Sequence, residues 1–243
     1  TSNNQDGDGY GIYGQRYDAA GAAAGAEFQI NTYTAGGQQF TDVTELPDGG
    51  FVVTWTSNGQ DGDSDGVYGQ RFDAVGSAVG TEFQINTFTN GQQQTPSIAA
   101  MPDGRMVVTW SSDGPDASEH GVYGQIFDVG ASSSSSNGSS SGGITFTPQK
   151  VGSEFQVNTY TTGDQGNPVF FGPGSPDPVV ATAANGNYLV IWSSDGQDGS
   201  SKGIYGQLYA PDNSVIGAEI LVNEVTSSQQ THPDAGFFSD GRF

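Results

Sequence analysis

The chain of 243 residues contains no cysteine and few cations. The absence of cysteine excludes disulfides and thiolate metal sites. Six lysines and arginines stand against 27 aspartates and glutamates, which gives a formal net charge of −21. Nucleic acid and anionic membrane surfaces would repel such a chain, so neither is an expected partner. No apolar run approaches the length of a membrane-spanning helix, so membrane insertion is not expected either.

The start of the sequence also lacks two common features. The first ten residues, TSNNQDGDGY, contain neither an initiator methionine nor an apolar signal region. We therefore expect an interior segment of a longer precursor.

A repeat of about 55 residues is the main positive feature of the chain. Tyr-Gly-Gln begins at Tyr13, Tyr68, Tyr123 and Tyr205. Tryptophan ends an apolar run at Trp55, Trp110 and Trp192, and Glu-Phe-Gln begins at Glu27, Glu82 and Glu154, with a weaker copy at Glu219. Self-similarity at a fixed period indicates a propeller, a solenoid or an open array. A residue that all copies share more often serves the architecture than a single active site.

Each copy of the repeat predicts four short strands. Hairpins of type I′ are expected at four dipeptides that tolerate positive φ, namely Asp48-Gly49, Asp103-Gly104, Asn185-Gly186 and Asp240-Gly241. An apolar strand ending in Trp follows, then a loop rich in Gly and Asp, the Tyr-Gly-Gln strand and the Glu-Phe-Gln strand. Four such strands in sequence form an antiparallel meander, which is the unit of a propeller blade.

The expected fold is therefore all-β, a four-bladed β-propeller. Its blades are predicted at residues 231–243 joined with 1–34, at 35–89, at 90–162 and at 163–230. The third blade carries a Ser-rich insertion at 130–146, and a proline-rich insertion lies near 166–178. The first blade combines both ends of the chain, which predicts neighbouring termini. An open β repeat array, a solenoid or a sandwich are the alternatives.

The loops after the Trp positions are the best candidate sites. Asp alternating with Gly lets carboxylates and carbonyls converge on a hard cation such as Ca²⁺. The loop Asp61-Gly-Asp63-Ser-Asp65-Gly66 resembles the opening of an EF-hand but lacks the distal Glu. Ordinary turns use the same residues, which is the competing interpretation. The candidate Ca²⁺ ligands are Asp6, Asp8, Asp61, Asp63, Asp65, Asp116, Glu119 and Asp198. The second loop has three alternating acids, whereas the fourth contains Lys202, so the second loop is expected to bind best.

Other recurrent residues favour structural roles. Gln15, Gln70, Gln125 and Gln207 are predicted to bind buried backbone groups. The three Trp side chains are predicted to lie buried between blades, with stacking on sugars as the alternative. His120 and His232 stand in no catalytic pattern. Paired acids for glycoside hydrolysis are available, but no pair stands out, so we expect the chain not to be an enzyme.

Two segments carry a resemblance to a known group of proteins. VGTEFQINTFTNGQQQTPSIAAMPDGRMVVTWSSDG and DGDSDGVYGQRFDAVG resemble tandem repeats of very large secreted or surface proteins of Gram-negative bacteria and cyanobacteria. The resemblance covers nearly the whole chain outside the two insertions. It implies an extracellular, type I-secreted, calcium-rich setting and an adhesive role. Such proteins often carry RTX nonapeptides, but G-G-x-G-x-D is absent here, so RTX calcium chemistry is not implied.

The expected function follows from the repeat, the acidity and this resemblance. We expect an extracellular, Ca²⁺-stabilised structural or adhesive module of a large bacterial surface protein. Its expected partners are glycans or other copies of the surface protein. The alternatives are a lectin-like carbohydrate-binding propeller and a glycan-active hydrolase.

Overall fold

The structure, a computed structural model, describes residues 1–114, 120–130, 148–166 and 177–243. These residues form sixteen strands in five sheets and contain no helix, which confirms the all-β prediction. Within the described ranges, no helix is long and apolar enough to cross a membrane. Most of the Ser-rich insertion and the core of the proline-rich one lie outside the described residues.

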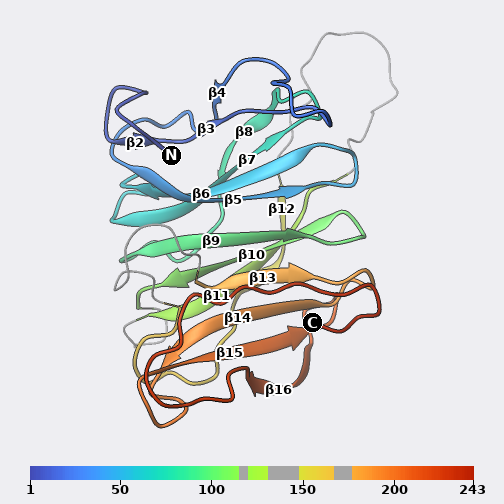
Figure 1. The fold of residues 1–243 in the computed structure, drawn as a ribbon. Coiled ribbons are helices and arrows are strands. Elements are labelled where there is room, and N and C mark those ends of the chain that lie inside the picture. Colours follow the sequence, from blue (N-terminus) through green and yellow to red (C-terminus); the bar gives the residue numbers. More distant parts are fainter. Residues whose placement is uncertain (115–119, 131–147, 167–176) are drawn as a thin grey trace.

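Three sheets are complete copies of the predicted four-strand meander (Figure 1). The first contains β5 (Gln38–Glu45), β6 (Phe51–Asn58), β7 (Asp65–Phe72) and β8 (Ala78–Gln84). The second contains β9 (Gln93–Ala100), β10 (Arg105–Ser112), β11 (Gly121–Asp128) and β12 (Gln149–Gln156). The third contains β13 (Val179–Thr182), β14 (Tyr188–Asp195), β15 (Lys202–Tyr209) and β16 (Val215–Leu221). Neighbouring strands are antiparallel, and the sheets follow one another in a row in sequence order.

The two ends of the chain form less regular structure. Residues 1–34 contain only two-residue strands, in which β1 (Ser2–Asn3) pairs with β2 (Tyr10–Gly11) and β3 (Tyr13–Gly14) pairs with β4 (Phe28–Gln29). Residues 231–243 contain no strand, although the turn at Gly241 forms, with the Gly241 N–H donating to the Phe238 carbonyl at 3.0 Å. No sheet of the described residues pairs the two ends. The four-blade prediction is therefore not confirmed.

The hairpin turns form where the sequence predicts them, but their type differs. The Gly49 N–H donates to the Leu46 carbonyl at 2.9 Å, and the Leu46 N–H donates to the Gly50 carbonyl at 2.8 Å. Gly49 has a φ of 80°, whereas Asp48 is not in the left-handed region. This pattern is a type I turn followed by a left-handed glycine, because a type I′ turn needs positive φ at both central residues. Gly104, Gly186 and Gly241 occupy the same position with positive φ.

The core lies between the sheets, and a Trp stands at the centre of each contact. All three Trp side chains are fully buried. Trp55 clusters with Ile12 and Ile30 of the N-terminal segment, Trp110 with Val67 and Ile85 of the first complete sheet, and Trp192 with Val122 and Val157 of the second. The prediction that they occupy equivalent positions between repeats is confirmed.

The contact between neighbouring repeats is the same each time. A Glu on the outer strand accepts a hydrogen bond from a backbone N–H of the preceding repeat, as in the 2.6 Å bond from Thr87 to Glu154. Glu82 accepts in the same way from Thr32, and Glu219 from Thr159. An aromatic pair accompanies each contact, at centroid distances of 5.6 Å for Phe28–Phe72, 5.8 Å for Phe83–Phe127 and 5.8 Å for Phe155–Tyr209. One contact pattern thus joins the whole row.

Candidate functional site

The inner edges of the three complete sheets border a cavity. Strands β5, β9 and β13 lie side by side (Figure 1). Ser97 links all three, because its Oγ donates to Asp42 Oδ2 at 3.1 Å and accepts the Val180 N–H at 3.2 Å. The cavity beside them measures about 700 Å³. This inner cavity is lined by Thr1, Gln39, Phe40, Thr41, Asp42, Thr95, Pro96, Ser97, Ile98, Val179, Val180, His232, Pro233, Asp234 and Ala235.

Two carboxylates line the inner cavity. Asp42 is firmly oriented, because its oxygens also accept the backbone N–H groups of Ile98 at 2.9 Å and of Val43 at 2.8 Å. Asp234 comes from the C-terminal segment and accepts the Ala235 N–H at 2.8 Å. His232 lies two residues before it on the same cavity. The cavity therefore combines two acids and an imidazole from opposite ends of the chain.

Neither acid is among the site residues predicted from the sequence, although a signal for both exists. Counted from the glutamines Gln38, Gln93 and Gln230, the same repeat position holds Asp42, Ser97 and Asp234. Residues common to all copies serve the architecture, as the Trp and Glu contacts show. A position that changes between copies while its neighbours stay constant is the pattern that would have pointed to this cavity.

The backbone around the inner cavity is strained at three equivalent positions. Phe40 and Thr95 both have a φ of 52°, and His232 has a φ of 60°. Non-glycine residues in this region cost on the order of 1–3 kcal/mol each and cluster at functional sites. The pairing of β5 with β6 shifts between Gln39 and Asp42, so Phe40 and Thr41 form a bulge at the cavity wall. Bulges of this kind are common beside active sites.

Asp177 supports the wall of the cavity from behind. It takes the place in the third sheet that Phe40 and Thr95 take in the others, and its carbonyl accepts the Thr95 hydroxyl at 2.9 Å. Its carboxylate accepts both the backbone N–H and the hydroxyl of Ser193. Burial raises the pKa of Asp177 to about 6, although the bonds from Ser193 act in the opposite direction. Because both oxygens face Ser193, this carboxyl holds the wall and does not enter the cavity.

The acids of the second Asp/Gly loop bind separate groups of the protein. Asp61 accepts the Asp63 N–H at 3.3 Å and the Asn86 side-chain amide at 3.4 Å. Asp63 accepts the Gly91 N–H at 2.9 Å. Asp65 accepts the side-chain amides of Asn58 at 3.0 Å and Gln94 at 2.5 Å. The three carboxylates thus bind groups at separate positions in and around the loop.

The remaining predicted ligands follow the same pattern. Asp6 is 3.5 Å from the Asn31 amide, Asp8 accepts the Gly36 N–H at 3.1 Å, and Asp198 accepts the Ser200 N–H at 3.0 Å. Asp116 and Glu119 lie outside the described residues. In the part of the chain that the structure describes, no group of three or more His, Asp or Glu side chains is placed to hold a metal ion. The Ca²⁺ site stays a prediction.

A steric relation explains the Asp-to-Gly spacing of these loops. A Cβ at Gly66 would lie 2.6 Å from Asp61 Oδ2, and one at Gly11 would lie 2.4 Å from Asp6 Oδ2. Gly203 and Asp198 repeat this relation at 2.8 Å. The carboxylate therefore packs against bare backbone five residues later, and this repeated feature serves the turn itself.

The recurrent glutamines have the structural role predicted for them. Gln70 Nε2 donates to the carbonyls of Arg71 at 2.8 Å and Val79 at 3.3 Å, where the pairing of β7 with β8 is irregular. Gln15, Gln125 and Gln207 make the equivalent pairs of bonds. These amides satisfy backbone groups that the bulge leaves outside the ladder.

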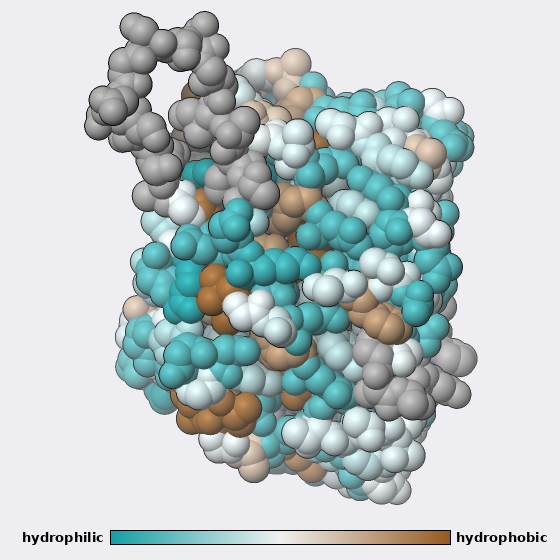
Figure 2. Space-filling view, turned by 180° about the vertical axis from the view of Figure 1, so that it is seen from behind, coloured by the Kyte–Doolittle hydropathy of each residue, from teal (hydrophilic) through white to brown (hydrophobic). Residues whose placement is uncertain are grey.

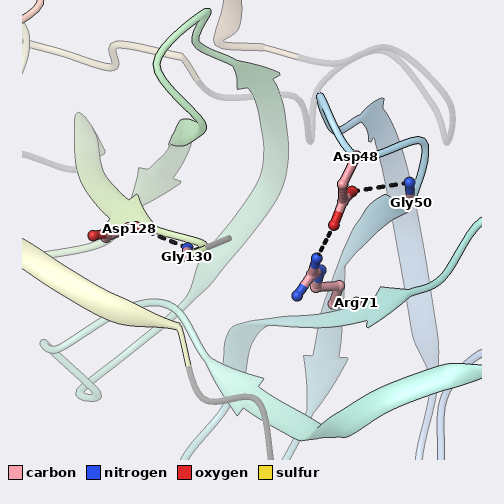
Figure 3. Close-up of polar contacts among 5 residues, drawn as sticks. All are labelled: Asp48, Gly50, Arg71, Asp128 and Gly130. Atoms are coloured by element: carbon pink, nitrogen blue, oxygen red, sulfur yellow. Dashed lines mark hydrogen bonds and ion pairs between the residues drawn. The ribbon is translucent and has the colours of Figure 1, made fainter. Parts of the chain in front are cut away.

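A smaller hollow of about 220 Å³ lies between the hairpin ends of the first two complete sheets. Figure 3 shows Asp48 there, pointing toward Arg71 of β7 and accepting the Gly50 N–H at 3.0 Å. Asp128 fixes the neighbouring turn through the Gly130 N–H at 2.7 Å. The Arg71 charge is matched by Asp48 within the protein, so the inner cavity is the stronger candidate site.

Comparison with solved structures finds several distant matches. An endo-arabinase from Bacteroides thetaiotaomicron matches with a TM-score of 0.41 and 14% identity over 84% of this chain and 70% of that one. A thermostable family-43 glycoside hydrolase matches with a TM-score of 0.41 and 13% identity over 78% of this chain and 55% of that one. A protein of unknown function from Dyadobacter fermentans matches with a TM-score of 0.33 and 11% identity over 82% of this chain and 68% of that one. No protein-family model and no curated protein matches the chain.

These matches correct one expectation. The sequence analysis expected that the chain is not an enzyme, whereas the two best-scoring structures named above are glycoside hydrolases. That expectation is therefore wrong as it stood. The chain spans about half of the family-43 hydrolase, and the TM-scores are below 0.5. The lining of the inner cavity, and not this likeness, is the basis for the activity and substrate proposed for this chain.

Proposed function

We propose that the chain acts on glycans and binds a neutral saccharide in the inner cavity. The observation that carries the proposal is the convergence of Asp42 and Asp234 on one cavity of about 700 Å³. Small-molecule sites typically measure about 300–1,000 Å³. The proposal keeps the extracellular setting that the repeat resemblance implies, with Ca²⁺ as a proposed stabiliser of the loops.

The chemistry of the lining supports a saccharide. Gln39 and Thr41 offer amide and hydroxyl groups that match sugar hydroxyls. Phe40 and the two prolines of the lining offer apolar surface for the C–H faces of a sugar ring. The net charge of −21 disfavours anionic ligands, so a neutral glycan fits better than an acidic one.

Two carboxyl groups are what glycoside hydrolysis requires. One protonates the leaving oxygen, and the other acts as base or nucleophile on the opposite side of the sugar. Asp42 is the better oriented of the pair, because three hydrogen bonds hold it, and it suits the second role. Asp234 is then the proton donor.

The experiment combines activity with binding. Purified protein is incubated with a panel of neutral polysaccharides, and released reducing ends are measured for the native chain, Asp42→Asn and Asp234→Asn. Asp240→Asn is the matched control, because Asp240 is exposed in a hairpin turn that does not line the cavity. We expect release by the native chain and the control and its loss in both cavity variants. Saccharide binding without release of reducing ends would show a lectin and overturn the proposed hydrolysis. The absence of both binding and release on every glycan would refute the whole proposal.

A further inference from the structure

The last sheet of the row exposes a face that is covered in every other repeat. Ile30, Ile85 and Val157 occupy one repeat position, three residues after the recurrent Glu, and their exposed fractions are 7%, 0% and 2%. Val222 occupies the same position after Glu219 and is 52% exposed. Ile220 and Val225 beside it are 38% and 64% exposed. We call Ile220, Val222 and Val225 the trailing face.

The first repeat of the row exposes the opposite half of the same contact. Phe72, Phe127 and Tyr209 stand four residues after the recurrent Tyr and are 2%, 1% and 3% exposed. Each contacts an aromatic residue of the preceding repeat. Tyr17 is their equivalent in residues 1–34 and is 65% exposed. We call Tyr17 and the nearby Glu27 the leading face.

Glu27, on the leading face, differs from the equivalent glutamates of the other repeats in its hydrogen bonds. Glu82, Glu154 and Glu219 each accept a backbone N–H from the residue after a buried Asn in the preceding repeat. Glu27 accepts the side-chain amide of Gln5 from its own repeat at 2.6 Å, as Glu82 accepts that of Gln60 and Glu219 that of Gln197. Among the described residues, Glu27 accepts no hydrogen bond from another repeat. The residue after the equivalent Asn of the last sheet is Glu224, which is exposed. A Glu27 carboxylate and a Glu224 N–H are therefore the two halves of a fourth contact.

The two faces lie at opposite ends of the row, as β3 with β4 and β16 do in Figure 1. Figure 2 shows an apolar patch near the lower end of the molecule, one of several on that face. We infer that the trailing face of one copy of this chain docks on the leading face of a second copy, head to tail. The partner is fixed by continuity, because the same pair of surfaces already forms three contacts inside the chain. Such an interface is heterologous, so it leaves one free face at each end of a dimer.

The contact between copies buries less surface than those inside the chain. Residues 1–34 contain no Trp-bearing strand, so the central side chain of the internal contacts has no counterpart on the leading face. The association is therefore reversible and depends on protein concentration.

Sedimentation velocity over a range of protein concentrations tests the inference. We expect the average mass of the native chain to rise with concentration, and Val222→Asp and Tyr17→Asp each to raise the dissociation constant about tenfold or more. Val151→Asp is the matched control, since Val151 is 38% exposed on β12 in the middle of the row. Both target side chains are exposed, and equal melting temperatures confirm that the variants fold.

Mixing the variants separates this interface from a symmetric one. Val222→Asp retains an intact leading face, and Tyr17→Asp retains an intact trailing face. An equimolar mixture should therefore form dimers that stop at two copies, although neither variant associates alone. A native chain that stays monomeric at all concentrations would overturn the inference. Association unaffected by either substitution, or a mixture that stays monomeric, would do the same.

Discussion

The sheet of β9 to β12 and residues 1–34 contain copies of the same repeat, yet they fold to different extents. The Tyr-Gly-Gln motif of the former lies in β11, which has eight residues and pairs with β10 along its whole length. The same motif in the latter lies in β3, which has two residues and pairs only with β4. The missing element is the Trp-bearing strand. The motif sequence alone thus does not set the length of a strand, and the apolar neighbour on its other side does.

Replacing a buried Trp of the complete sheets tests that conclusion. Trp110→Ala should lower the free energy of unfolding by about 3–5 kcal/mol, because a fully buried aromatic side chain leaves a cavity between two sheets. Tyr17→Ala, at an exposed position of the N-terminal segment, should change it little. Urea unfolding of dilute protein measures both. Similar losses from the two substitutions would remove the distinction between the regions.

Asp177 should give the third complete sheet a pH dependence of stability that the equivalent Phe40 and Thr95 do not give the first two. Asp177 has a pKa of about 6 when folded and an ordinary value near 4 when unfolded, so the folded protein binds its proton more tightly. The protonated Asp177 therefore stabilises the fold fully below about pH 4. This contribution, roughly 3 kcal/mol at most, is lost as the pH rises through 6. Relative to Asp177→Asn, the native chain should therefore be more stable at pH 4.5 than at pH 7.5.

Urea unfolding at both pH values measures this difference. The Asn variant keeps an acceptor for the Ser193 N–H and removes the titration, so the other carboxylates cancel in the comparison. Stability curves that run parallel from pH 4.5 to 7.5 would contradict the burial of an ionisable Asp177.

Ca²⁺ is expected to stabilise the loop of the second repeat copy more than that of the fourth. A ligand present at 100 times its dissociation constant adds about 2.7 kcal/mol to stability. We expect millimolar Ca²⁺ to raise the melting temperature relative to EDTA, and Asp63→Ala to reduce that rise more than Ser200→Ala. Thermal melting monitored by circular dichroism measures it. An equal midpoint with and without Ca²⁺ would show that the loop acids serve only the turns.

The recurrent glutamine is buried in one repeat and half-buried in another, and its replacement should have the smallest effect. Gln70 is buried and donates two hydrogen bonds to backbone carbonyls, so Gln70→Ala should cost about 1 kcal/mol for each bond. Gln15 makes the equivalent bonds just after β3, where it is half-buried and water can replace them, so Gln15→Ala should cost less. Equal losses in urea unfolding would show that burial does not decide the value of these bonds.

The strands, the turn positions and the Trp contacts could be predicted because they depend on local pattern. Alternation, glycine placement and the apolar run before Trp110 all act within one repeat. The inner cavity could not be predicted, because Asp42 and Asp234 are far apart in sequence and line one cavity only through the arrangement of the sheets. The acids of the loops could be identified from the sequence, but the groups that their carboxylates bind could not. Backbone N–H groups of neighbouring glycines, such as Gly91, compete with any cation for their oxygens.

The Glu contact between repeats has a direction, and this direction makes the protein behave as a one-dimensional chain of coupled units. Glu154 holds the loop after Asn86, and Glu219 holds the loop after Asn158. Loss of one repeat therefore removes a restraint from the repeat before it, whereas the repeat after it keeps its own. Nearest-neighbour coupling of this kind lets opening begin at a terminus and travel inward. Amide protons in the middle sheet should consequently exchange with solvent most slowly, and those of the first and last repeats most rapidly.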